Sequence, residues 1–468
     1  MTKIKLRFAA ATALATFALF PAQANVPPIK PVQSDPVHNA LANDEIAWNI
    51  IEGLTTEIGP RQAGTDAEAR ARTWAVTKLN ILGFENVRIE PFMMPTWVRG
   101  VETAEVISPY TQKLAVTALG NSASTGENGL EAEIVYFQTL ADLQAVSDHR
   151  LKGKIAFVSH AMKPTQDGSS YGAFGPARFV GPNIAAQKGA AAIIIRSAGT
   201  DHHRNPHTGN TNFAEGVIPI PAGALSIPDA ENLERIISRG QPVRIKLKLT
   251  PRNLGQQASG NVISEIVGSN KNLPPILIAC HLDSWDLATG AIDNAAGCGI
   301  IAAAARQVKD AGKPKRTIRL LWAGAEEVGV WGGKAYGEAH KNEKHALVME
   351  SDFGADRVWQ VKFNLPESAK GLADKIANKL ATISVGRSNE KAGDGADIGP
   401  IMKAQNLAAV DLSQDGTRYF DLHHTPDDTF DKIDKDQLRQ NVAAWTAVLN
   451  VLANDDSDLT LAAASAKP

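Results

Sequence analysis

The sequence predicts an α/β protein: a mixed, mainly parallel sheet flanked by helices, with a β-rich domain inserted into it. Short apolar runs such as Ile276–Ala279 have the length and composition of buried strands, and segments with helical periodicity separate them. The pattern changes between about residues 110 and 250, where strand-like runs follow one another more closely. A chain of 468 residues is also too long for one ordinary hydrophobic core, so we expect two domains.

The sequence pattern near both ends of the mature chain predicts helices. Apolar residues recur at helical spacing over residues 43–57, and a second helix is expected over residues 65–82, where Gly83 ends it. The ENVRIEPF segment that follows is strand-like. Near the other end, Asp434 is placed to cap the N-terminus of a last helix that carries one apolar face.

The inserted segment predicts strands in GKIAFVSH, GAAAIIIRS and QPVRIKLKLT, and a helix over residues 229–239. Its most unusual feature is the loop SAGTDHHRNPHTGN, which contributes three histidines: His202, His203 and His207. A His-rich stretch can bind metal, but only one acidic residue accompanies these three. We therefore favour a solvated or structural loop over a wall of the substrate pocket, and either of these over an independent metal site.

The segment HLDSWDLATGAID carries the strongest chemical signal. It directly follows the apolar run Ile276–Ala279, so His281 and Asp293 should project from the carboxyl end of a buried strand. Both side chains are ligands for divalent cations. Asp283 is placed to accept the other ring N–H of His281 and so to fix the orientation of its imidazole.

Further strand-like runs end in the same kinds of residues. In an open parallel sheet such strand ends meet in one crevice. Two imidazoles and three carboxylates suit two zinc ions that share one carboxylate, with one more carboxylate left to act as a base. The runs are Thr317–Ala323 before Glu326 and Glu327, His345–Met349 before Glu350 and Asp352, and Asn406–Leu412 before His423 and His424.

These strings resemble the M28 family of zinc peptidases, and most closely its carboxypeptidase Q-like (plasma glutamate carboxypeptidase) branch. The matching strings are TTEIGPR, HLDSWD with GAID, AEE, MESD and HHTPDDT, and they occur in the family's order along nearly the whole mature chain. The resemblance implies a zinc-peptidase fold. It also implies that the inserted segment is a protease-associated (PA)-like domain, which covers the crevice and restricts the size of the substrate.

The resemblance further implies the role of each site residue. Asp293 would bridge the two ions, and Glu326 would be the general base that takes a proton from the attacking water. The family often has a second acid after the bridging aspartate, where this chain has Asn294, and relatives have a cis peptide bond at that position. The implied metal ligands are His281, Asp293, Glu327, Asp352 and His424, with His423 as a packing neighbour.

The predicted function is that of an exported dizinc metallopeptidase, an aminopeptidase or dipeptidase that acts on dipeptides or on the N-terminal residues of short peptides. Two alternatives share the same fold: a catalytically inactive, receptor-like protein, and a glutaminyl-cyclase-like transferase that uses one zinc ion. Retention of the full ligand set disfavours the first, and the number of bound metal ions distinguishes the second. Relatives are often dimers, so a homodimer is an open possibility.

Residues 1–24 have the features of a secretory signal peptide. A basic start precedes an apolar run of about 13 residues, which is too short to span a bilayer comfortably, and Ala22-Gln23-Ala24 offers a cleavage site. We therefore expect an exported protein, periplasmic or secreted, with no membrane segment after cleavage. Loss of the three basic residues of this segment takes the formal charge from −2 to −5, which argues against a nucleic-acid partner.

The remaining expectations concern domain limits and the two cysteines. The peptidase domain is expected over residues 25–109 and 251–454, around the inserted domain at 110–250, with a disordered tail at 455–468. Cys280 and Cys298 do not make a disulfide-rich scaffold. We favour two buried free thiols over a disulfide, and either of these over a thiolate ligand.

Overall fold

The computed structural model describes residues 35–148 and 150–462. The predicted signal peptide, residues 1–24, lies outside the described residues. No helix in the described part of the chain combines the length and apolar character that crossing a membrane requires.

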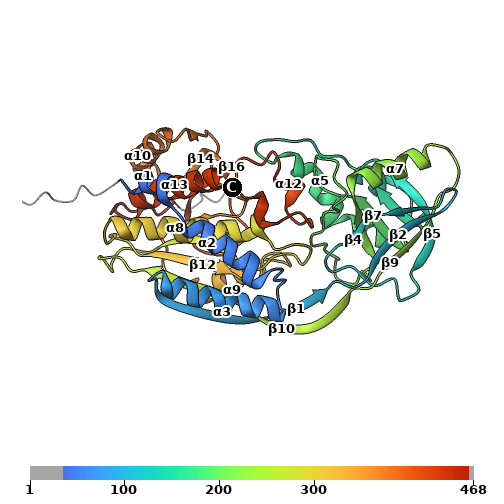
Figure 1. Ribbon diagram of the computed structural model, residues 1–468, viewed down its shortest axis with the longest axis horizontal. Helices are drawn as coiled ribbons and strands as arrows, with labels where there is room; N and C mark the ends of the chain where they lie inside the picture. Colours follow the sequence, from blue (N-terminus) through green and yellow to red (C-terminus); the bar gives the residue numbers. More distant parts are fainter. Residues whose placement is uncertain (1–34, 149, 463–468) are drawn as a thin grey trace, which may run out of the picture. The chain divides into compact units, whose positions relative to one another are not determined.

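A first sheet of eight strands confirms the predicted mixed, mainly parallel architecture (Figure 1). Its central strands β12, β11, β13 and β16 run parallel to one another. β10 pairs antiparallel with both β1 and β12, and β14 pairs antiparallel with β16 and parallel with β15. All four predicted strands that precede ligand-type residues belong to this parallel centre. In sheet order the strands are β1 (Glu85–Val98), β10 (Arg252–Ile266), β12 (Ile318–Ala323), β11 (Ile276–His281), β13 (Leu347–Glu350), β16 (Ala408–Gln414), β14 (Val358–Asn364) and β15 (Gly386–Arg387).

Helices cover both faces of this sheet. The larger core lies under α2, α3, α8 and α13, and a smaller one lies under α9 and α11 (Figure 1). Of the predicted helices, α3 begins after its cap Thr65 and α13 after its cap Asp434, as expected. The first predicted helix, residues 43–57, corresponds to α2 followed directly by a π-helical turn at Leu54–Ile58. The helices are α1 (Pro36–Asn43), α2 (Ile46–Gly53), α3 (Asp66–Ile81), α8 (Ala296–Ala311), α9 (Trp331–Ala339), α10 (Lys370–Ala381), α11 (Gly399–Gln405), α12 (Tyr419–Leu422) and α13 (Lys435–Leu452).

A second sheet, also of eight strands, lies in the middle of the sequence, between β1 and β10 of the first sheet. The three predicted strands of this segment are its β6, β7 and β9. Its order is β3 (Gln112–Leu114), β2 (Glu102–Ser108), β9 (Arg244–Leu249), β5 (Leu130–Phe137), β6 (Ile155–Val158), β7 (Ala192–Arg196), β8 (Ala222–Leu225) and β4 (Val116–Ala118). Its helices are α4 (Leu140–Ala145), α5 (Ser170–Phe179), α6 (Gly181–Gln187) and α7 (Ile227–Ile237).

The two cysteines correct one expectation. Cys280 and Cys298 form a disulfide rather than two free thiols, and their Cα atoms lie 5.2 Å apart. The bond joins the carboxyl end of strand β11 to the first turn of helix α8. The two cysteines are 18 residues apart in the sequence, which does not by itself predict that they are close in space. They meet because the loop between them folds back and α8 starts beside the end of β11.

The C-terminal segment corrects a second expectation. Residues 455–462 were predicted to be disordered, yet Leu459 is buried and Arg316 donates to the carbonyl oxygens of Asp455 and Ser457. The contact was not visible in the local sequence, because the arginine that holds this segment lies about 140 residues earlier. Residues 463–468 lie outside the described part of the chain.

Candidate metal centre

The carboxyl ends of the central strands bring the predicted metal ligands together. Asp293, in the loop after β11, lies at the middle of the cluster and is almost completely buried. Its Oδ1 is 2.9 Å from Nε2 of His281, and its Oδ2 is 3.1 Å from Nε2 of His424. The two oxygens of one carboxylate therefore face two different imidazoles.

Each imidazole also faces a second carboxylate. Nε2 of His281 lies 3.1 Å from Oδ1 of Asp352, and Nε2 of His424 lies 2.8 Å from Oε2 of Glu327. The five residues thus form two groups of three that share Asp293. This is the arrangement that a pair of bridged divalent cations requires.

Glu326 lies on the His281 side of the cluster, within reach of Asp352. Burial raises the pKa of the Glu326 carboxyl group well above its ordinary value, and the neighbouring acids Asp352 and Glu327 raise it further. The adjacent Glu327 faces His424 instead. The two consecutive glutamates thus serve opposite sides of the cluster.

Asp283 contributes differently from what we expected. Nδ1 of His281 lies 3.1 Å from the backbone carbonyl oxygen of Asp283 but 3.6 Å from the nearer oxygen of its carboxylate, so the carbonyl is the closer acceptor. The buried carboxylate instead accepts the backbone N–H groups of Glu326 and Glu327, at 3.1 and 3.3 Å. Asp283 therefore connects the loop after β11 to the loop after β12.

Asn294, the residue after Asp293, holds the loop in place. The peptide bond between Asp293 and Asn294 is cis, as predicted. The Asn294 amide donates to the carbonyl oxygen of Ser351, next to Asp352, and accepts the N–H of Gly297 in α8. Asn294 therefore links the strand end that carries Asp352 to the helix that follows Asp293.

Arg61 and Asp428, from two of the family-like strings, support the same loop. Arg61 is fully buried and donates to the carbonyl oxygens of Leu282, Thr289 and Gly290. The carboxylate of Asp428 accepts the backbone N–H of Asp293 at 3.1 Å. Neither residue stands out in the local sequence, because their contacts join segments more than 130 residues apart.

The two consecutive histidines stack on each other, with ring centroids 4.0 Å apart, but they face different neighbours. His424, at a positive φ of 58°, points Nε2 into the cluster, whereas the ring of His423 stacks on Tyr419 with centroids 4.5 Å apart. His207 of the inserted segment lies against both, with ring centroids 4.7 Å from His423 and 5.1 Å from His424. A third group of ligand-type atoms consists of these three histidines, and no carboxylate belongs to it.

The three histidines of the inserted loop therefore do not act together. His207 is buried beside the cluster, Nε2 of His203 lies 2.6 Å from the carbonyl oxygen of Asp421, and the side chain of His202 is 72% exposed. The prediction of a structural loop describes His203. His207 is buried against His423 and His424, and the pocket-wall alternative stays a prediction.

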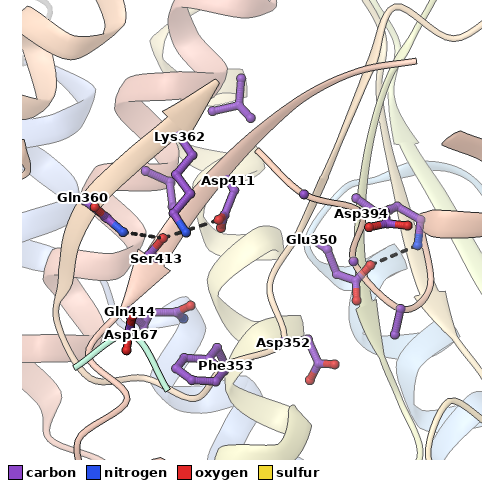
Figure 2. A pocket seen from close by; sticks show the side chains of 16 residues that line it. Asp167, Glu350, Asp352, Phe353, Gln360, Lys362, Asp394, Asp411, Ser413 and Gln414 are labelled. Atoms are coloured by element: carbon purple, nitrogen blue, oxygen red, sulfur yellow. Dashed lines mark hydrogen bonds between the residues drawn. The ribbon is translucent and has the colours of Figure 1, made fainter. Parts of the chain in front are cut away.

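A cavity of about 300 Å³ opens beside Asp352 (Figure 2). Its lining includes the carboxylates of Glu350, Asp394 and Asp411 and the ammonium group of Lys362. Burial raises the pKa of Asp411 above its ordinary value, and Lys362 opposes that shift. The cavity is large enough for an amino-acid side chain, and it adjoins the metal cluster on the Asp352 side.

The donor set fits divalent cations. Burial raises the pKa of Glu327 to about 7, with the neighbouring Asp293 adding to the shift. Oε1 of Glu327 is buried and has no hydrogen-bond partner among the described residues. So many carboxylates packed together out of water need compensating positive charge, and imidazole and carboxylate donors are ligands that zinc accepts.

Three comparisons relate this chain to known proteins. Residues 261–449 match the description "Peptidase family M28". Carboxypeptidase Q of Bos taurus is 33% identical over 404 residues, which cover 86% of this chain and 84% of that protein. The crystal structure of a peptidase M28 precursor from Shewanella amazonensis SB2B matches with a TM-score of 0.88 and 42% identity, over 92% of this chain and 97% of that one.

The fold also occurs in a more distant protein. A zinc aminopeptidase from Bacillus subtilis matches with a TM-score of 0.63 and 21% identity, over 89% of this chain and 96% of that one. A match over 89% of this chain is too long to be confined to either sheet alone, so the shared fold includes the inserted segment.

Proposed function

The chain belongs to peptidase family M28, and from this premise we propose that it is an exported dizinc metallopeptidase that hydrolyses dipeptides or removes N-terminal residues from short peptides. One observation carries the proposal: the two oxygens of Asp293 face two different imidazoles, each of which also faces another carboxylate. A mononuclear site has no need for such a shared carboxylate.

The five clustered residues would hold the metal ions. His281 and Asp352 would hold one ion, His424 and Glu327 would hold the other, and Asp293 would be shared between the two. Two zinc ions here would supply Lewis acidity, which polarises a peptide carbonyl and makes water more acidic.

Glu326 is the general base in this proposal. On the His281 side the shared metal ligand is Asp293, so the Glu326 carboxylate is not needed as a ligand. It can instead take a proton from the attacking water and pass it to the leaving amine. The buried carboxylate of Asp283 holds the backbone N–H of Glu326 and thereby positions the base. The cavity beside Asp352 would take the side chain of the residue that precedes the scissile bond.

The site of action is proposed to be outside the cytoplasm, most simply the periplasm. The predicted signal peptide at residues 1–24 supports this, and so does the disulfide between Cys280 and Cys298, because disulfides persist in oxidising compartments.

The proposal is tested by metal analysis and a substrate screen on the mature protein. We expect about two zinc ions per chain by mass spectrometry of the metal content. We also expect hydrolysis of dipeptides and short peptides with a free N-terminus and no hydrolysis of N-acetylated peptides. One zinc ion per chain would favour the glutaminyl-cyclase-like alternative, and two zinc ions without hydrolysis of any peptide would favour the receptor-like one.

A further inference from the structure

The cavity beside Asp352 contains a carboxylate for which the proposed mechanism has no use. Asp411 lies in the middle of β16, between Val410 and Leu412, whose side chains pack into the larger core on one face of the sheet. Asp411 is therefore on the opposite face, together with Ala409 of the smaller core. An acid at such a position of a central strand is uncommon, and here its side chain lines the cavity (Figure 2).

The charge of Asp411 is poorly compensated. Among the described residues its carboxylate forms no ion pair, and its hydrogen-bond donor is the hydroxyl of Ser413, at 3.4 Å. Lys362, the one cation among the described residues that line the cavity, lies opposite Asp411 across β14 and β16, but its ammonium group pairs with the exposed Glu390 at 2.9 Å. Burial raises the pKa of Asp411 because the ionised carboxylate is held away from water. A cation inside the cavity would offset that cost.

The other acids of the cavity do not replace Asp411. Oε2 of Glu350 accepts the backbone N–H groups of residues 397 and 398, at 3.0 and 2.9 Å, and so holds the loop before α11 against the cavity. Asp167 and Asp394 also line the cavity, but both are exposed to solvent. They add negative charge that favours a cation, whereas Asp411 is the partly buried carboxylate that a ligand inside the cavity could contact.

The strand register sets the depth of Asp411 relative to the metal cluster. In the parallel pair of β13 and β16, Val348 lies opposite Ala409. The same register, continued along both strands, places Asp411 at the level of Glu350, two residues before the proposed ligand Asp352. Two residues of a strand span about 7 Å. A substrate held at Asp352 would therefore reach Asp411 only with a long side chain.

We propose that the cavity selects substrates whose N-terminal residue is lysine or arginine, and that Asp411 binds the cationic end of that side chain. This inference rests on the proposed peptidase function, in which the cavity takes the side chain that precedes the scissile bond. The aliphatic stem of either residue is long enough to pass from Asp352 to Asp411, and its charge then meets a carboxylate that has no other cation. An acidic side chain would place a second negative charge beside Asp411.

The first experiment compares substrates that differ in charge but hardly in shape, on the unmodified, zinc-loaded protein. Lysyl-alanine is paired with norleucyl-alanine, and arginyl-alanine with citrullyl-alanine. The charged member of each pair should be the better substrate, by roughly 10- to 100-fold in kcat/KM, because it forms hydrogen bonds to a charged group. Equal kcat/KM within both pairs would overturn the proposal. Failure to hydrolyse any of the four would instead count against the peptidase function itself.

The second experiment uses two variants and a matched control. Asp411→Asn should bring the lysyl-to-norleucyl ratio of kcat/KM close to one, and Asp411→Glu should restore part of it, because glutamate keeps the charge. The control is Asp310→Asn, an exposed aspartate near the end of α8 that pairs with Arg306, which should leave the ratio unchanged. Equal losses for both substrates in Asp411→Asn, with the ratio preserved, would show that Asp411 only supports the strand and would overturn the proposal.

A binding measurement provides a readout that does not depend on turnover. Analogues of lysyl-alanine and norleucyl-alanine, in which a methylene-amine group replaces the scissile amide, are titrated calorimetrically, with zinc content measured in parallel. Asp411→Asn should weaken binding of the lysyl analogue roughly 10- to 100-fold and leave binding of the norleucyl analogue nearly unaffected. Equal weakening of both analogues, or loss of zinc, would overturn the proposal, because Asp411 would then support the site without reading the side chain.

Discussion

At the scale of single residues, the site depends on side chains that face two partners at once. Asp293 faces two imidazoles, and Asp283 holds the backbone of two consecutive glutamates. Because Glu326 and Glu327 are neighbours with opposite orientations, a single backbone segment would supply both the base and a ligand of the proposed mechanism. Substitutions at these positions should therefore separate proton transfer from metal binding.

Glu326→Gln should abolish turnover and leave the zinc content unchanged. A carboxamide cannot accept the proton of the attacking water, so we expect a loss of at least roughly 10²–10⁴-fold in kcat. Steady-state kinetics together with metal analysis checks this. Loss of one zinc ion in this variant would show that the roles of Glu326 and Glu327 are exchanged.

His424→Ala should lower both zinc occupancy and activity far more than His423→Ala. Nε2 of His424 faces two carboxylates of the cluster, whereas the ring of His423 stacks on Tyr419. Metal analysis after dialysis against a weak chelator measures the difference. Comparable zinc loss from the two variants would contradict the assignment.

At the scale of elements, the buried arginine Arg319 links two neighbouring strands to the segment that follows a helix. Arg319 of β12 pairs with Glu265 of β10 at 2.7 Å and with Glu343, beyond α9, at 2.7 Å. Its hydrogen bonds lower the pKa of Glu343 to about 2. The ionised form of Glu343 therefore stabilises the folded state.

Glu343→Gln should lower the free energy of unfolding at pH 7 by roughly 1 kcal/mol, a small value because the Glu343 side chain is 40% exposed. Since the folded pKa lies below the unfolded one, this contribution is present in full above pH 4.5 and is lost as the pH falls through about 2. Urea unfolding at pH 7, 4.5 and 3 should show the difference shrinking with acidity. Glu338→Gln, whose exposed side chain pairs with Lys341, is the control and should change little.

At the scale of the whole molecule, the inserted segment is bound to the loop that carries His424. The carboxylate of Asp421 accepts the backbone N–H and the hydroxyl of Thr200 and the N–H of Asp201. The carbonyl oxygen of the same residue lies 2.6 Å from Nε2 of His203. One aspartate thus anchors the histidine-rich loop beside the metal cluster.

Asp421→Ala should therefore loosen two distant segments together. Hydrogen exchange should become faster over residues 198–210 and over residues 419–424, because each segment loses the partner that holds it. Asp142→Ala removes the carboxylate that accepts the backbone N–H of Thr139, the N-cap of α4 in the same inserted segment, and should change exchange only around α4. Faster exchange in only one of the two segments would show that they are not coupled through Asp421.

Export makes a separate prediction for the whole chain. Cleavage after Ala24 should leave a mature protein that begins at Asn25. Mass spectrometry of the protein recovered from a periplasmic fraction measures this end directly. A protein that keeps residues 1–24 and stays in the cytoplasm would contradict the prediction.

The sequence by itself determined the features that depend on neighbours along the chain. Apolar runs marked the central strands, Thr65 and Asp434 marked the starts of α3 and α13, and ligand-type residues marked the ends of the strands. Because the ends of parallel strands must meet at one edge of a sheet, this local pattern predicted that ligand-type residues gather there, and the family resemblance implied which five of them are ligands.

Only the tertiary structure decided which distant residues complete the site. The disulfide of Cys280, the packing of residues 455–462 and the approach of Arg178 to His424 each join segments that no periodicity relates. Local patterns report which face of a strand or helix is buried, but not what that face meets after the chain has turned back. Close packing makes that choice, and here it places a buried arginine of the inserted segment beside a metal cluster built on the other sheet.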